Sequence, residues 1–181
     1  MTQPLWIFGY GSLIWDPGFT PVETRRARLT GWRRSFCMRS IHFRGTPEAP
    51  GLVLALDHDP VAECAGLVFR VGEDQAEPVL SALRARELVT NAYLEQCLPV
   101  RCEGGETVAA ITYVIDPAGP QYCALTPEDQ AQIIARATGL RGPNRDYLWN
   151  TARHLRAHGL SDEGLDALAA RVDALCGGDL R

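Results

Sequence analysis

A short loop near the start of the chain combines two glycines with a serine, in the run Phe8-Gly9-Tyr10-Gly11-Ser12-Leu13. Glycine lets a ligand approach the main chain closely, so this loop can present backbone N–H groups beside the Ser12 hydroxyl. Such donors suit a small anionic or zwitterionic molecule. The preceding apolar run, Leu5 to Phe8, is typical of a buried strand, and small-molecule sites often lie at the end of such a rigid support. We therefore expect a binding loop where the first strand ends.

This loop differs from the familiar glycine-rich motifs. A dinucleotide fingerprint needs a third glycine where the chain has Ile14, and a Walker loop needs a lysine, which the chain lacks altogether. A nucleophile elbow needs glycine two positions on either side of Ser12, where Tyr10 and Ile14 stand instead. Ser12 is therefore predicted to hold a ligand rather than to act as a nucleophile, and a tight turn without a ligand is the remaining alternative.

Glu87 is the second candidate for chemistry, because it stands at the end of a predicted helix over residues 78–87. If the helix ends there, the partial negative charge of its C-terminus raises the pKa of Glu87. A carboxylate of this kind is suited to accept a proton near neutrality. The alternative is a surface glutamate paired with Arg84 or Arg86.

The segment from Arg25 to Gly45 contains seven arginines and no acid, interleaved with Trp32, Phe36 and Phe43. Arginine and aromatic side chains together can hold phosphates and stack bases, which is the argument for a non-enzymatic RNA-binding module. Two alternatives remain. The arginines can lie on the solvent face of a strand and pair with acids from elsewhere, or they can form a local patch that holds a carboxylate.

Histidine and cysteine spacing gives no sign of a metal site. His154 and His158 are four residues apart on a predicted helix, but Leu155 follows where a zinc protease motif has glutamate. The six cysteines contain no C-x-x-C pair, so we expect small buried thiols in a reducing compartment. We expect neither a metal nor a cofactor.

Bulk composition predicts one domain over residues 1–181, because a chain of this length with 46% hydrophobic residues can build one well-buried core. The net charge of -4 and the pI near 5.6 argue against a protein that coats nucleic acid or an anionic membrane. No apolar run is long enough for a membrane span and no leader is recognisable, so a cytoplasmic protein is expected.

Periodicity places strands first and helices later, the arrangement of an α+β fold with a small mixed sheet or barrel and helices packed outside. Strands after the first are predicted over residues 27–38, 51–57, 64–72, 93–101 and 107–115. Helices after residues 78–87 are predicted from Thr126 to Gly139, from Asn144 to Gly159 and from Ser161 to Gly177. Residues 44–51, rich in proline and glycine, are predicted to form a surface loop that can lie over the site.

Taken together, these segments resemble the ChaC family of γ-glutamylcyclotransferases, in its glutathione-specific branch, over nearly the whole chain. The loop continues as Ile14-Trp15, and the wider superfamily shares its Tyr-Gly-Ser-Leu core. The run Arg44-Gly45-Thr46-Pro47-Glu48 narrows the resemblance to the ChaC branch. Further shared segments are Gly31-Trp32-Arg33-Arg34-Ser35-Phe36, Pro50-Gly51-Leu52-Val53-Leu54-Ala55-Leu56, Arg86-Glu87 with Tyr93, and Gly142-Pro143-Asn144-Arg145-Asp146-Tyr147-Leu148.

The resemblance implies a γ-glutamylcyclotransferase-like fold and a lyase that converts glutathione to 5-oxoproline and cysteinylglycine by intramolecular aminolysis. It assigns Phe8 to Leu13 to the γ-glutamyl group and makes Glu87 the catalytic acid and base. Arg39 or Arg44 would then meet the glycine carboxylate, and Tyr147 would line the pocket. A cyclotransferase for another γ-glutamyl amine or peptide is the alternative, and the oligomeric state stays open.

One local departure from the family pattern concerns the turn after Glu87. A glycine is expected there before the tyrosine, whereas this chain has Thr90-Asn91-Ala92-Tyr93. The turn can therefore differ in shape from that of the family. A different turn would change the position of Tyr93, which the resemblance places among the substrate-binding residues.

Overall fold

The computed structural model describes residues 4–177. The chain divides into two compact units. The first unit is built from residues up to Arg34 together with Ala55–Gly119, and the second from Ser35–Leu54 together with the residues from Pro120 onward. Each unit draws on two separate stretches of chain, and the single domain expected over residues 1–181 stays a prediction.

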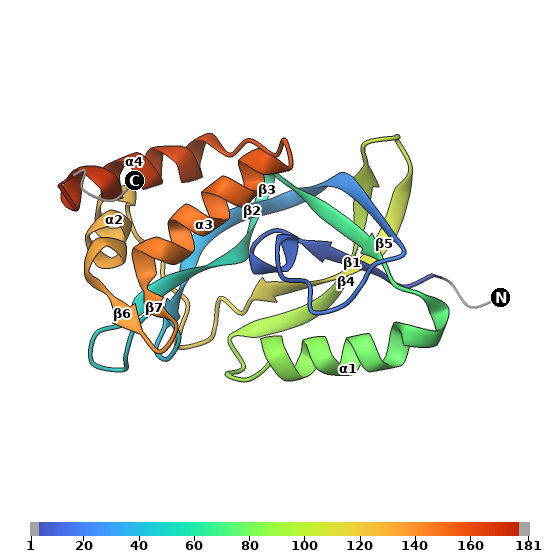
Figure 1. Ribbon diagram of the computed structural model, residues 1–181, viewed down its shortest axis with the longest axis horizontal. Coiled ribbons are helices and arrows are strands. Elements are labelled where there is room, and N and C mark those ends of the chain that lie inside the picture. Colours follow the sequence, from blue (N-terminus) through green and yellow to red (C-terminus); the bar gives the residue numbers. More distant parts are fainter. Residues whose placement is uncertain (1–3, 178–181) are drawn as a thin grey trace. The chain divides into compact units, whose positions relative to one another are not determined.

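A closed barrel with strand order β1-β3-β2-β4-β5 forms the sheet (Figure 1). Its strands are β1 (Trp6–Gly9), β2 (Glu23–Ser40), β3 (Gly51–Arg70), β4 (Tyr93–Cys102) and β5 (Thr107–Ile115). β1 runs antiparallel to β3 and parallel to β5, so the sheet is mixed, as predicted. All four residues of β1 are buried, so both faces of the strand are covered, which explains its continuous apolar run. The predicted α+β barrel is confirmed.

The two strands predicted over residues 51–57 and 64–72 form one strand, β3, in the structure. The prediction was wrong because Asp57 to Pro60 has the composition of a turn. In the structure this segment stays extended beside β2, where Trp32 meets the edge of His58 at 5.3 Å and Arg33 lies 3.3 Å from Asp57. Cross-strand pairs of this kind stabilise a strand whose own propensity is low.

The helix α1 (Ala76–Glu87) belongs to the first unit and lies alongside β4 (Figure 1). It follows a short 3-10 turn, η2 (Glu73–Gln75). Its apolar side packs into a buried cluster with β1 and β5, whose members are Ile7, Leu13, Val71, Val79, Leu83 and Tyr113. The structure thus confirms the predicted end of this helix at Glu87 and shifts its beginning by two residues.

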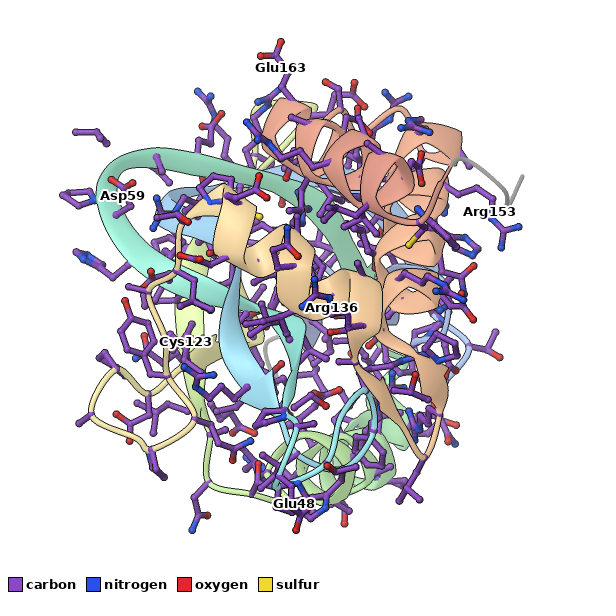
Figure 2. All side chains as sticks on the ribbon, turned by 90° about the vertical axis from the view of Figure 1, so that its left-hand side faces the viewer. Glu48, Asp59, Cys123, Arg136, Arg153 and Glu163 are labelled. Atoms are coloured by element: carbon purple, nitrogen blue, oxygen red, sulfur yellow. The ribbon has the colours of Figure 1, made fainter. Side chains whose placement is uncertain are left out.

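Three helices of the second unit pack against one another: α2 (Pro127–Arg136), α3 (Asn144–Ala157) and α4 (Glu163–Leu175). The Thr126 hydroxyl accepts a hydrogen bond from Asp129 N at 3.2 Å, which is the predicted N-cap of α2. Charged residues on the outer faces, such as Arg153 and Glu163, extend away from the helices (Figure 2). No helix within residues 4–177 is long and apolar enough to cross a membrane.

A two-stranded hairpin, β6 (Thr138–Gly139) and β7 (Gly142–Pro143), connects α2 to α3 and was not predicted, because two-residue strands leave no periodic pattern. Residues 44–51 lie against it. A Cβ at Gly139 would lie 2.5 Å from Gly45 N, so the two backbones are in close contact and both positions need glycine. Residues 46–49 are exposed, as predicted for a surface loop, whereas Gly45 and Gly51 are buried.

Candidate active site

The loop from Phe8 to Leu13 leaves β1 and enters a single 3-10 turn, η1 (Ser12–Ile14). The Ile14 N–H donates to the Gly11 carbonyl at 2.9 Å. The N–H groups of Ser12 and Leu13 come before this bond and therefore have no acceptor inside the turn. The Ser12 side chain is partly exposed. The predicted loop thus combines a hydroxyl with main-chain donors.

The aromatic side chains of the loop support it from inside the barrel. Phe8 is fully buried, and its carbonyl accepts a hydrogen bond from Thr112 Oγ1 at 3.1 Å. Tyr10 is 8% exposed, and its hydroxyl donates to the Tyr113 carbonyl at 2.8 Å. The side chains of these two predicted binding residues are therefore engaged within the protein.

Neighbouring strands fix the backbone of the loop. Arg34 Nε donates to the Tyr10 carbonyl at 2.7 Å, and its Nη2 donates to the Ala65 carbonyl. A Cβ at Gly66 would lie 2.7 Å from Cζ of Phe8 and would clash with the Gly9 carbonyl. β3 therefore needs glycine at this point, because the loop crosses it at contact distance. A site held on rigid elements loses little entropy when a ligand binds.

Packing of α1 directs Glu87 toward the loop. Leu83 shares the buried cluster with Leu13, which follows Ser12 directly. Glu87 comes four residues after Leu83, so it lies on the same side of the helix. It is the last residue of α1, and its side chain is 17% exposed. The carboxyl group is therefore held near the loop, away from bulk water.

The side chain of Arg86 connects Glu87 to the loop. Arg86 Nε lies 3.2 Å from Glu87 Oε1, and Arg86 Nη2 donates to Ser12 Oγ at 3.1 Å. A third contact runs from Nη1 to the Asp16 carbonyl at 2.7 Å. Glu87 thus pairs with Arg86, as predicted in the alternative of a surface glutamate. The same guanidinium also contacts the predicted binding loop.

Tyr113 of β5 belongs to the same buried cluster as Leu13 and Leu83. Its hydroxyl donates to Glu95 Oε2 at 3.2 Å, and Arg84 forms hydrogen bonds of 2.9 and 2.7 Å to the same carboxylate. Burial, with further contributions from the charges of Glu95 and Glu87, raises the pKa of Tyr113 far above that of a free tyrosine. Tyr113 is therefore a neutral phenol, close enough to Glu87 for the charge of that carboxylate to contribute to its raised pKa.

Tyr93 follows the turn after Glu87 and begins β4, where it pairs with Ile115 of β5. It is partly buried and packs against the cluster that contains Leu13 and Leu83. Asn91 in this turn has φ 53°, and it is the one residue other than glycine with a positive φ within residues 4–177. Asparagine tolerates this left-handed conformation better than most residues, which explains how the chain forms the turn without the expected glycine.

Arg44 and Tyr147, both predicted to bind substrate, lie together in the second unit. The Arg44 guanidinium lies 5.7 Å from the centroid of the Tyr147 ring, within the range of a cation–π contact. Its Nη1 donates to the carbonyls of Arg141 and Pro143 at 2.7 and 3.1 Å. Burial lowers the pKa of Arg44, which nevertheless stays charged. The carbonyls and the ring hold the guanidinium in one place.

Arg39 also belongs to the second unit, and its main chain forms two hydrogen bonds of 2.8 Å with Gln121. Its guanidinium has no ion-pair partner within residues 4–177, and its charge lowers the pKa of the nearby Cys123 thiol against the larger effect of burial, which raises it. Neither Arg39 nor Arg44 has an acid in an ion pair within residues 4–177, but the Arg44 guanidinium already donates to two carbonyls.

The arginines at positions 25, 26, 28 and 33 pair with acids, which come from β2 itself, from β3 and from the turn between β4 and β5. Arg25 pairs with Glu106 and Glu23 at 2.5 Å, and Arg28 pairs with Glu63 at 3.0 Å. The expectation that these charges pair with acids elsewhere is confirmed, which weakens the RNA-binding alternative. No group of three metal-ligating side chains occurs within residues 4–177, and His154 and His158 stand apart from any such set.

Comparison with known proteins places the chain in a family. The family model described as ChaC-like protein matches residues 5–175. The chain belongs to the ChaC-like family. The glutathione-specific γ-glutamylcyclotransferase of Escherichia coli (strain K12) is 38% identical over 173 residues, which cover 95% of this chain and 74% of the relative. The human glutathione-specific γ-glutamylcyclotransferase 1 is 33% identical over 177 residues, with 96% and 79% covered.

The ChaC-like fold is also that of a solved structure. The crystal structure of a glutathione-specific γ-glutamyl cyclotransferase from yeast matches with a TM-score of 0.87 at 22% identity, and the match covers 99% of this chain and 100% of the other. At this level of identity the likeness concerns the fold. The predicted γ-glutamylcyclotransferase-like architecture is confirmed.

Two residues near Glu87 were not among the predicted site residues. Tyr113 lies in the middle of a strand whose apolar pattern does not distinguish it from core residues. Arg86 was noted as a partner for a surface glutamate and as part of a shared segment, without a role of its own. Its contact with Ser12 depends on the packing of α1 against the loop, which no local pattern reveals.

Proposed function

We propose that this protein is a glutathione-specific γ-glutamylcyclotransferase that converts glutathione to 5-oxoproline and cysteinylglycine. The observation that carries the proposal is the position of Glu87, whose carboxylate lies beside Arg86 while Arg86 contacts the loop hydroxyl of Ser12. The curated relatives from Escherichia coli and human bear the same activity in their names. The roles of individual residues below are part of the proposal.

The reaction needs a folded substrate and a proton carrier, but no nucleophile from the protein. The α-amino nitrogen of the γ-glutamyl group attacks its own γ-carbonyl, a new C–N bond closes the five-membered ring, and the bond to the cysteine nitrogen breaks. Holding the chain in the folded geometry makes the attack effectively unimolecular, which can remove roughly 7–11 kcal/mol from a barrier. The loop from Phe8 to Leu13 would hold the γ-glutamyl group in this geometry.

Glu87 would carry the proton. The α-amine is mostly an ammonium at neutral pH and must lose a proton before it attacks. Glu87 would accept this proton and give it to the departing cysteine nitrogen. The second proton, which the attacking nitrogen loses when it becomes the lactam N–H, also ends on the released amine, which leaves as an ammonium, so that no proton is gained or lost overall. A positioned acid and base of this kind typically contributes about 10²–10⁴-fold to the rate. N–H groups of the loop would stabilise the oxyanion of the tetrahedral intermediate.

Arg39, Arg44, Tyr93 and Tyr147 keep the substrate-binding roles that the resemblance assigns, as predictions. The unpaired guanidinium of Arg39 supports a contact with the glycine carboxylate, since an arginine without an acid partner can form a bidentate pair with a carboxylate. Cytoplasmic location is likewise a proposal. It is supported by all six cysteines being free thiols, as expected in a reducing compartment.

The proposal is tested by incubating the protein with glutathione, oxidised glutathione and several γ-glutamyl dipeptides, and by measuring 5-oxoproline released from each. We expect release from glutathione in preference to the dipeptides. Preferential release from a γ-glutamyl amine or dipeptide would instead favour a cyclotransferase of different specificity. Failure to release 5-oxoproline from any of them would overturn the proposed activity. Substrate incubated without protein serves as the blank for uncatalysed cyclisation.

A further inference from the structure

We propose that Arg86 is a positioning residue for the reaction, which holds the Glu87 carboxylate against the substrate loop through Ser12. This inference rests on the proposed function, in which Glu87 transfers the proton. Arg86 is adjacent to Glu87 in the sequence. It acts through Glu87 and does not contact the substrate.

The contacts of the guanidinium support a bracing role. All three nitrogens of Arg86 have protein partners: Nε lies by Glu87 Oε1 at 3.2 Å, Nη2 by Ser12 Oγ at 3.1 Å and Nη1 by the Asp16 carbonyl at 2.7 Å. The Asp16 carboxylate adds a longer contact of 3.7 Å to Nη1. The side chain thus joins the end of α1 to the first residue of η1 and to Asp16, two residues after η1.

Helix geometry explains why Glu87 needs such a brace. Glu87 is the last residue of α1, where helices fray, and its side chain has several rotamers to choose from. Neighbouring residues on a helix do not face each other, so an Arg–Glu pair at adjacent positions forms only when one side chain is fixed elsewhere. Arg86 meets this condition because Ser12 and Asp16 anchor its far end.

This pair is less exposed than the pairs Arg25–Glu23, Arg84–Glu95 and Arg101–Glu63. The side chains of Arg86 and Glu87 are 27% and 17% exposed, compared with 64% for Arg101 in its pair with Glu63. A less solvated pair is less screened by water and salt, so its geometry is better defined.

The planar fork of arginine is essential to this role. Lysine at position 86 would keep the positive charge, but a single ammonium cannot replace three nitrogens that point in fixed directions. Arg86→Lys should therefore restore part of what Arg86→Met loses. A contribution of the aliphatic stem alone would leave both variants at the wild-type rate, and a contribution of the charge alone would leave Arg86→Lys at the wild-type rate.

The first experiment measures kcat and KM for 5-oxoproline release from glutathione by the wild-type protein, Arg86→Met, Arg86→Lys and the control Arg101→Met. We expect Arg86→Met to lower kcat about 100-fold, the usual consequence of a misplaced catalytic group, with KM nearly unchanged. Arg86→Lys should lie between Arg86→Met and wild type, and Arg101→Met should match wild type. Wild-type kcat in both Arg86 variants would overturn the inference.

The second experiment measures glutathione affinity by calorimetry in Glu87→Gln and in the double variant Arg86→Met with Glu87→Gln. A positioning residue acts through Glu87, so the two affinities should agree. Affinity more than about tenfold weaker in the double variant, equal to about 1.4 kcal/mol, would make Arg86 a substrate ligand and overturn the inference. If Arg86→Met does not fold by circular dichroism, Arg86→Lys decides by the same measurements.

The two proposals fail in different ways. A wild-type protein that releases no 5-oxoproline would overturn the proposed function and the role of Arg86 with it. An active wild-type protein with fully active Arg86 variants would overturn the role of Arg86 alone.

Discussion

Arg86 and Ser12 are 74 residues apart in the sequence, yet one hydrogen bond joins them, and the adjacent Glu87 shares the same guanidinium. The chemistry proposed here depends on this short connection between an acid at a helix end and a loop at a strand end. Neither partner is unusual by itself. What matters is that the Arg86 side chain is held at both ends and so restricts where the Glu87 carboxylate lies.

The neighbouring group of Glu95, Arg84 and Tyr113 gives a pH-dependent prediction. Two hydrogen bonds from Arg84 hold the pKa of Glu95 below its usual range, against the effect of burial, which raises it. A depressed pKa means that the unfolded chain binds the proton more readily. Glu95 therefore stabilises the folded protein above the ordinary glutamate pKa of about 4.3, and this contribution is lost as the pH falls through the lower folded value.

Glu95→Gln should consequently lose less stability than wild type when the pH falls from 6 to 3. Urea unfolding of both proteins at the two pH values measures this difference. Tyr113→Phe tests the smaller contribution of the phenol, which donates to the same carboxylate at 3.2 Å. Equal losses in wild type and Glu95→Gln would contradict the assignment of the shifted group.

At the scale of elements, α1 and the turn after it decide where the site residues lie. Leu83 anchors the helix in the cluster with Leu13, and this contact places Glu87 one turn later on the same side. The turn must then reverse the chain so that Tyr93 can begin β4. Asn91 makes this reversal with a positive φ.

Replacement of Asn91 tests that account of the turn. Asn91→Gly should fold with unchanged or slightly higher stability, because glycine adopts a positive φ without strain. Asn91→Val should destabilise the protein by about 1–2 kcal/mol, since a β-branched side chain is strained in the left-handed region. Thermal or urea unfolding of the three proteins measures the effect. Equal stability of Asn91→Val and wild type would show that the turn rearranges freely.

The sequence predicted the elements with strong local signals and missed those that depend on distant contacts. The first strand, the α2 cap at Thr126 and the end of α1 at Glu87 were all found, because apolar runs and capping residues are local. The break predicted within β3 was wrong, since pairs such as Trp32 with His58 come from another strand. The β6–β7 hairpin was missed because two-residue strands leave no periodic pattern.

The site divides in the same way. The glycine-serine loop and Glu87 could be named from motif and resemblance, while the contact of Arg86 with Ser12 could not, because it depends on how α1 packs. Tyr113 was missed, since a buried tyrosine in a strand looks like any core residue. The expected glycine before Tyr93 is absent, and the backbone of Asn91 takes the conformation that a glycine would have.

At the scale of the whole molecule, the proposed cyclotransferase site consists of a loop and one carboxylate, and the barrel supports the loop. The barrel fixes the loop backbone through Arg34 and Gly66, and the ChaC-like family gives the fold a context. The arginine-rich strand is the main argument for an RNA-binding protein. Most of its arginines form ion pairs with acids of the same chain. These observations favour an enzyme that acts on a small molecule.

Glu87→Gln tests the central claim most directly. The substitution keeps the size of the side chain but cannot accept and return a proton, so we expect a folded protein that binds glutathione with wild-type affinity. Its release of 5-oxoproline should fall at least about 10²-fold, the lower bound for loss of a positioned acid and base. Calorimetry for binding and product release for turnover, on the same preparation, separate the two effects. Turnover near the wild-type rate in Glu87→Gln would contradict the account.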